Sequence, residues 1–333
     1  MSSSKLPASN SSLSNFPSIF RTTAWLSSWH STWGRHLQEY KIPFDQYFYN
    51  IPLPIGRFKI VTAIPCGCGS VKLNSIRSEY FQLQQDWDDV SKLLISSDWQ
   101  QLIVPDIETN TPDFFKLKMF SSNRGYFLLQ RSVAIAYGIV TQNQNFSEYL
   151  SQLSQSARAR IFNKRKKLEQ MGKLVIENIW PDVDRFIELL NQFHLQRWGK
   201  LCYEGSNLEF VKGFLQAISN EGGKVKLSLM TLDDQVISVL LDVEYQGRVY
   251  NFQAGFIEKF SNNIALGSLH LGYEIEAAFS NPLINYYDFM AGQGKNSDYK
   301  AAFANNKQEL ATVYLIKSRW LYWLYRIKDR ISS

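Results

Sequence analysis

Cysteine, histidine and long apolar runs are all scarce in this sequence. The 333 residues include only 3 Cys and 4 His, and neither the Cys66-Gly-Cys68 spacing nor the histidines form a redox or metal-binding pattern. No stretch approaches the roughly 18 consecutive apolar residues of a transmembrane helix, and the serine-rich N-terminus has no apolar core typical of a signal peptide. We therefore expect a cytoplasmic protein in a reducing setting, with no metal and no membrane span.

Apolar and aromatic residues are, by contrast, abundant. Hydrophobic residues make up 45% of the chain and aromatic residues 14%, which is enough apolar surface to offset the chain entropy lost on folding. The length is about twice that of a typical single domain, so two cores are expected. The net charge of +6 favours anionic partners such as phosphates, nucleic acid or a lipid surface.

Composition and periodicity divide the chain into five parts. We expect a disordered tail over residues 1–18, a mixed α and β domain over 19–146, a basic bridging helix over 147–172, a second domain over 173–317 and an amphipathic helix over 318–333. Between Ser151 and Leu168 the bridging segment carries six Arg or Lys residues and no acid. Two interpretations remain open for it: a solvated helix face, or a surface that meets a phosphate-bearing ligand or an anionic surface.

The second domain shows a clear alternation of elements. Two antiparallel hairpins are expected where three strands follow one another with short turns. The expected elements, in order, are a strand over 174–179, a helix from 181, a helix over 207–218, strands over 225–232, 236–244 and 249–256, a helix over 262–279, a strand over 286–290, a helix over 299–303 and a strand over 311–316.

The C-terminal segment has the pattern of an amphipathic helix. Trp320, Trp323, Leu324 and Ile327 form one stripe, with several basic residues beside it. Such a helix either packs back on its own domain or lies on an anionic membrane surface, where Trp and Tyr favour the interface.

Several motifs, taken together with the order of elements, resemble a known family. The residues concerned are Phe20 with Trp25-Leu26 and Trp29, the run from Ser156 through Lys164-Arg165-Lys166-Lys167-Leu168 to Gly172, His194 with Arg197-Trp198, Tyr287-Asp288-Phe289, Gly292, and Tyr299-Lys300. These motifs are similar to those of the FemAB-like, CelD/BioF-like N-acyltransferases, and the order β-α-α-β-β-β-α-β-α-β resembles the GNAT acyltransferase fold to which they belong.

This resemblance implies an α+β protein with tandem GNAT-like folds, each a mixed sheet flanked by helices. It implies N-acyl transfer from acyl-CoA, acetyl-CoA or longer, to an amine acceptor, with a small molecule or an amino sugar of a cell-surface polysaccharide precursor as acceptor. The loop that reads Phe260 to Gly267 departs from the usual phosphate-loop pattern of the superfamily. Two alternatives therefore stay open: an aminoacyl-tRNA donor, and a scaffold without catalysis. A location peripheral to the inner face of the membrane is compatible with each.

The resemblance also assigns roles to individual residues. Lys300 would neutralise the oxyanion formed when the amine attacks, and Asp288, Tyr299 and His194 complete the candidate catalytic set. His194 would be either the general base or a structural residue of its helix. Asp288 is expected either to pair with Lys300 or Arg197, or to orient the acceptor. Arg197 and Trp198 would line the acceptor site, where Arg197 would either clamp a carboxylate or phosphate of the acceptor or pair with a nearby acid to hold the helix. The donor would contact Gln253, Ala254 and Gly255 on a strand, and Ser261, Asn262, Asn263 and Gly267 before a helix, although one of Ser261, Asn262 and Asn263 could instead simply cap that helix.

Overall fold

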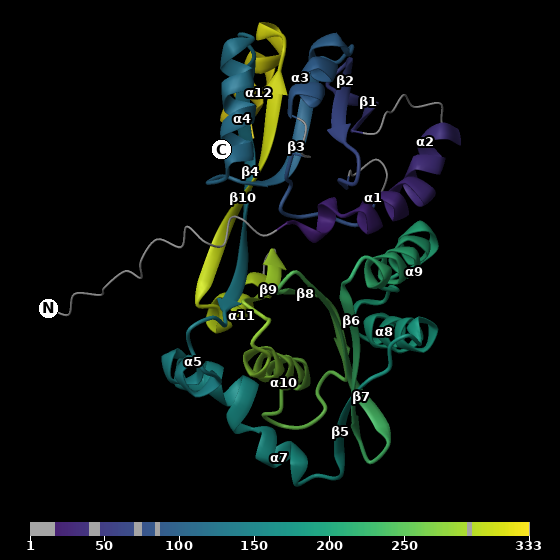
Figure 1. Ribbon diagram of the computed structural model, residues 1–333, viewed down its shortest axis with the longest axis vertical. Coiled ribbons are helices and arrows are strands. Elements are labelled where there is room, and N and C mark those ends of the chain that lie inside the picture. Colours follow the sequence, from purple (N-terminus) through teal and green to yellow (C-terminus); the bar gives the residue numbers. More distant parts are fainter. Residues whose placement is uncertain (1–16, 40–46, 70–74, 84–86, 292–294, 333) are drawn as a thin grey trace, which may run out of the picture.

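A computed structural model describes residues 17–39, 47–69, 75–83, 87–291 and 295–332 (Figure 1). A ten-stranded sheet runs through both halves of the chain, in the order β1-β2-β3-β10-β4-β9-β8-β7-β6-β5. The strands are β1 Phe48–Ile55, β2 Phe58–Pro65, β3 Gln101–Glu108, β4 Phe127–Val140, β5 Leu174–Asn178, β6 Lys224–Leu232, β7 Gln235–Tyr245, β8 Arg248–Phe256, β9 Tyr286–Ala291 and β10 Asn306–Ile316.

Helices cover this sheet in both halves of the molecule (Figure 1). Their bounds are η2 Ile19–Arg21, α1 Thr23–Trp29, η3 His30–Gly34, α2 Arg35–Glu39, α3 Trp87–Ser96, α4 Pro112–Asn123, α5 Phe146–Gln152, α6 Gln155–Arg158, η4 Ala159–Asn163, α7 Arg165–Glu169, α8 Val183–Trp198, α9 Gly205–Asn220, α10 Leu266–Ser280, α11 Lys295–Phe303 and α12 Arg319–Ser332. The order from β5 to β10 is the one that the sequence predicted, and the α+β class with a mixed sheet flanked by helices is confirmed.

The last strand of the sheet joins the first half of the chain. β10 pairs antiparallel with both β3 and β4, and β4 pairs in turn with β9 of the second half. The two halves are thus linked by continuous backbone hydrogen bonding (Figure 1).

The N-terminal helix also packs across the two halves. The ring of Trp25 in α1 lies 4.7 Å from that of Phe210 and 5.0 Å from that of Phe214, both in α9. Phe20 contacts Tyr250 of β8 at 6.0 Å between ring centres. The aromatic residues near the start of the chain therefore fasten the first half to the second.

The structure differs from the sequence-based expectation in two flanking segments. The prediction of a single bridging helix over 147–172 was wrong: the backbone is extended at Leu153, and Ser154 caps a new helix, so the segment is broken into α5, α6, η4 and α7. Residues 1–16 of the expected tail lie outside the described residues. Ser18 is buried and caps η2 through its side chain, so the tail does not extend to it.

Candidate functional site

The parallel strands β8 and β9 pair over a short stretch only. Their register joins Arg248, Val249 and Tyr250 to the residues from Tyr286 to Asp288, and it ends there. β8 continues to pair with β7 as far as Phe256, while β9 continues to Ala291. The C-terminal ends of these two strands therefore reach different surroundings, and the candidate site residues gather around them.

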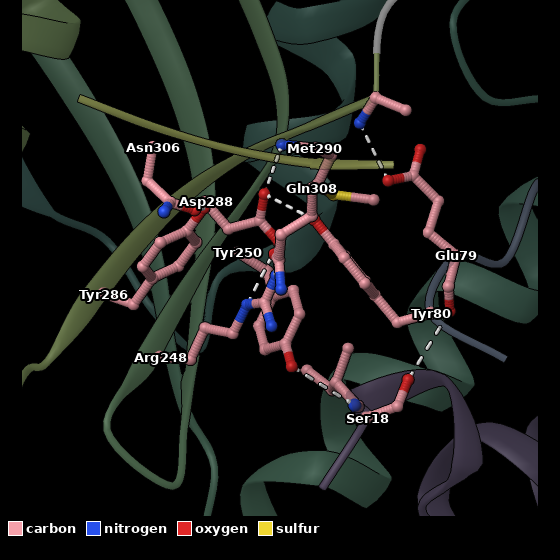
Figure 2. A network of polar contacts seen from close by, with 12 residues as sticks. Ser18, Glu79, Tyr80, Arg248, Tyr250, Tyr286, Asp288, Met290, Asn306 and Gln308 are labelled. Carbon is pink, nitrogen blue, oxygen red and sulfur yellow. Dashed lines mark hydrogen bonds and ion pairs between the residues drawn. The ribbon is translucent and has the colours of Figure 1, made fainter. Parts of the chain in front are cut away.

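Asp288 lies at the point where the pairing ends, and it is fully buried. One carboxylate oxygen accepts from Arg248 Nε and Nη2 at 3.1 and 2.8 Å, and the other accepts from the Tyr80 hydroxyl at 3.0 Å and the Met290 amide at 2.7 Å (Figure 2). The prediction that Asp288 pairs with Lys300 or Arg197 was wrong, because its ion-pair partner is Arg248. Two guanidinium N–H groups, a hydroxyl and a backbone amide all donate to this carboxylate. We therefore favour a structural role for Asp288 over a role in orienting the acceptor.

The end of β9 is held in an unusual backbone conformation. Met290 has a φ of +59°, which non-glycine residues rarely adopt. The hydrogen bond from its backbone amide to the Asp288 carboxylate fixes that turn. The Lys300 ammonium donates to the carbonyls of Met290 and Ala291 at 3.1 and 3.3 Å, and the Ala291 amide donates to Glu79 Oε2 at 2.8 Å. Lys300 of α11 is therefore anchored at the end of β9, beside a carboxyl group from the first half of the chain.

Glu79 is a site residue that the sequence did not reveal. It is buried, and burial raises the pKa of its carboxyl from 4.5 to about 8, against the opposing effect of Arg77, whose Nε lies 3.7 Å away. Burial likewise lowers the pKa of Lys300, and the nearby carboxyl groups of Glu79 and Asp288 oppose that shift. The sequence around Glu79 has no periodic pattern that would mark it as a site residue. Its role depends on a contact with Ala291, some 200 residues further along the chain.

Tyr299 precedes Lys300 on α11 and lies near two cations, Arg197 and Arg160. Burial raises the pKa of its hydroxyl, while Arg197 and Arg160 act in the opposite direction. The Arg160 guanidinium also stands 5.2 Å from the ring centre of Phe303, one helical turn after Tyr299. The structure thus brings α11 close to basic residues from both α8 and η4.

The three predicted residues of α8 lie against the end of β8. His194 Nε2 is 3.3 Å from the carbonyl of Ala254, and burial lowers the pKa of this imidazole, which favours its neutral form. Arg197 Nε pairs with Glu258 at 2.6 Å, and its guanidinium stacks 4.6 Å from the ring of Trp198, which is 54% exposed. Arg197 is therefore partly committed to an acid on the same surface, which agrees with the alternative that it pairs with a nearby acid.

Two predicted donor residues are glycines whose role in packing is clear. A Cβ on Gly255 would lie 3.0 Å from Cβ of Phe193 in α8, and one on Gly267 would lie 2.4 Å from the ring of Phe256. Both glycines therefore allow helices to approach β8 closely. The neighbouring Gln253 and Ala254 are half-buried in β8.

The loop before α10 forms part of a basic groove. The helix has Ala265 at its N-cap with no side-chain cap bond, so the alternative that Ser261, Asn262 or Asn263 caps α10 was wrong. A groove of about 230 Å³ is lined by Arg160, Lys164 and the loop residues 263–265. Free backbone N–H groups at the start of a helix and two cations favour an anion.

The basic segment is only partly a solvated face. Arg165 is buried, forms an ion pair with Glu276 and stacks 3.8 Å from the ring centre of Tyr273. Lys167 donates to the carbonyl of Asn262 at 3.1 Å. Arg160 and Lys164 line the groove, whereas Lys166 and Lys167 are exposed. No group of acidic, His or Cys side chains suited to a metal occurs among the described residues.

Comparisons with known proteins agree with this geometry. Residues 155–301 match the acetyltransferase (GNAT) domain family. The structure resembles FemX with a TM-score of 0.54 and 12% identity, over 83% of this chain and 85% of that one. It also resembles the C-terminal domain of a protein from Agrobacterium fabrum assigned as a lysylphosphatidylglycerol synthetase, with a TM-score of 0.51 and 9% identity over 87% of each chain. No curated protein matches the sequence.

Residues 155–301, which contain β8, β9, Lys300 and the basic groove, thus match the GNAT domain family, and the GNAT-like fold that the sequence predicted is confirmed. The fold of the chain as a whole resembles that of FemX.

Proposed function

We propose that this protein transfers an acyl group from an anionic donor to an amine. The observation that carries the proposal is the Lys300 ammonium, buried and held by two carbonyls at the end of β9, where β8 and β9 have ceased to pair. A preorganised cation in a dry setting stabilises negative charge that develops in the transition state.

In this reaction the amine nitrogen attacks the acyl carbonyl carbon. A C–N bond forms, the carbonyl oxygen gains negative charge beside Lys300, and the bond to the donor's sulfur or oxygen then breaks. The amine loses one proton to a base and the leaving group gains one. His194 is a candidate base, since its lowered pKa keeps the imidazole neutral near physiological pH. Direct transfer of this kind requires no covalent enzyme intermediate.

The donor in this proposal is acyl-CoA, whose phosphates would lie in the groove of Arg160 and Lys164 at the start of α10. Gln253, Ala254 and Gly255 of β8 would contact the rest of the donor, between its phosphates and the acyl group. The acceptor would approach from the side of Arg197 and Trp198. An amino sugar of a polysaccharide precursor is the acceptor that we expect.

The experiment offers the purified protein acetyl-CoA, a longer acyl-CoA or aminoacyl-tRNA, each with a panel of amines, and detects the product by mass spectrometry. We expect an amide product with an acyl-CoA, and loss of this product in Lys300→Met. Lys307→Met, an exposed lysine on β10, is the matched control and retains activity. Product only with aminoacyl-tRNA would overturn the choice of donor. A folded protein that binds no donor would favour the scaffold alternative.

A further inference from the structure

One surface of the molecule gathers exposed aromatic and aliphatic side chains away from the candidate site. α12 packs through Leu321 and Tyr325, which are buried against Ile60, Leu129 and Ile316. Its opposite side exposes Trp320, Trp323, Ile327 and Ile331, at 45%, 47%, 55% and 79%. These four residues are spaced by three, four and four positions, so they form one continuous stripe along the helix.

The hairpin of β1 and β2 extends this stripe. Phe58, at its tip, is 56% exposed, and its ring lies 5.4 Å from that of Trp320. An open groove of about 580 Å³, mostly apolar, runs between the hairpin and α12, with Leu53, Leu324 and Ile331 among its walls. The apolar surface therefore spans two elements that lie far apart in the sequence. We name it the α12 surface: Phe58, Trp320, Trp323, Ile327 and Ile331.

Basic residues border the α12 surface. Arg57 and Lys59 flank Phe58, and Arg319 and Arg326, seven residues apart, follow one side of the helical stripe. Asp329 is the one acid in the described part of α12, and an ion pair with Arg131 neutralises it. The border is thus strongly positive around an apolar centre.

We infer that the α12 surface binds an anionic phospholipid bilayer. Tryptophan favours the boundary between headgroups and acyl chains, and arginine side chains there reach lipid phosphates. Charge complementarity decides for this partner, because an apolar protein partner would not require a basic border. The helix has 14 residues and is about 21 Å long, which is shorter than the roughly 30 Å hydrocarbon core, so it would lie in the interface instead of crossing it.

The whole chain is tested by co-sedimentation with vesicles of phosphatidylcholine alone or with about 30% phosphatidylglycerol. We expect binding to the anionic vesicles only. Trp320→Ser with Trp323→Ser, and separately Arg319→Gln with Arg326→Gln, should each weaken binding about tenfold or more. Circular dichroism confirms folding, and these side chains are exposed, so the fold should persist.

Matched controls are Met119→Ser on α4, an exposed apolar side chain, and Lys118→Gln with Lys173→Gln, which are exposed cations elsewhere. Both should bind like the wild type. Equal binding by the wild type and both α12 variants would overturn the inference, as would an absence of binding to anionic vesicles. A dimer in sedimentation velocity that Trp320→Ser with Trp323→Ser dissociates, without vesicle binding, would instead assign the surface to a second copy.

Discussion

The carboxylate of Asp288 accepts a hydrogen bond from the amide of Met290, two residues further along the chain, at 2.7 Å. This bond holds Met290 at a positive φ and turns its carbonyl, with that of Ala291, toward the ammonium of Lys300. Asp288 therefore acts on Lys300 through the backbone, without an ion pair between the two side chains.

Replacing Asp288 should destabilise the protein strongly. Asp288→Ala leaves Arg248, which is 4% exposed, as a buried charge without its carboxylate. Such a loss costs about 3–5 kcal/mol of the free energy of unfolding. Urea unfolding monitored by circular dichroism measures it. Glu209→Ala, which removes the exposed partner of Arg35, is the control and should cost no more than about 1 kcal/mol. Similar costs for both variants would contradict the structural role of Asp288.

Lys300→Met should lower kcat more than it raises KM, because the ammonium is needed most when the oxyanion forms. We expect a loss of about a hundredfold in kcat, the effect of removing one oxyanion donor. Steady-state kinetics give the values, with circular dichroism on the same sample. Lys300 is only 9% exposed and bonded to two carbonyls, so a modest loss of stability accompanies the change. A folded variant with wild-type kcat would show that Lys300 is purely structural.

The groove at the start of α10 should govern donor binding. Arg160→Gln with Lys164→Gln removes both cations that line it and should raise the dissociation constant of acyl-CoA about tenfold or more. Lys166→Gln, exposed and outside the groove, is the matched control. Isothermal titration calorimetry compares the three proteins. Equal affinities would remove the groove from the donor site. A bulky acid at Gly267 would be a poor probe, since its side chain collides with Phe256.

Glu79 should make the stability depend on pH. Its pKa is raised from 4.5 in the unfolded chain to about 8 in the folded one, so the native state binds the extra proton between these values. Stability contributed by protonated Glu79 is therefore present below about pH 4.5 and lost as the pH rises toward 8. The Tm of the wild type, measured by thermal unfolding at each pH across this range, should fall as the pH rises. The fall should be smaller for Glu79→Gln. Parallel curves for the two proteins would refute the assignment.

The sequence predicted the elements of the second half well, because each has a strong local pattern. The helical period of apolar residues in α8 and the turn residues of the β6-β7-β8 meander are local patterns, which can be recognised without knowing any distant contact. The bridging helix failed because its near-heptad apolar spacing continues across Leu153, whereas the capping side chain of Ser154 interrupts the helix there.

The site was predicted in part. Lys300 and Tyr299 were found through a motif; Tyr299 lies near Arg197, and Lys300 donates to two carbonyls at the end of β9. Arg248 and Glu79 were missed because their significance arises only from contacts with β9. The contacting residues are separated by 40 positions for Arg248 and Asp288 and by 212 for Glu79 and Ala291, so no local periodicity indicates them.

The position of β10 has a consequence for the order of folding during synthesis. β3 and β4 leave the ribosome long before β10, yet β10 is the strand that lies between them. Until residue 316 has been made, both strands expose open edges that can pair with other chains. The first half of the chain therefore cannot complete its part of the sheet until the second half has been translated. A chaperone that shields exposed strand edges would act mainly during this interval.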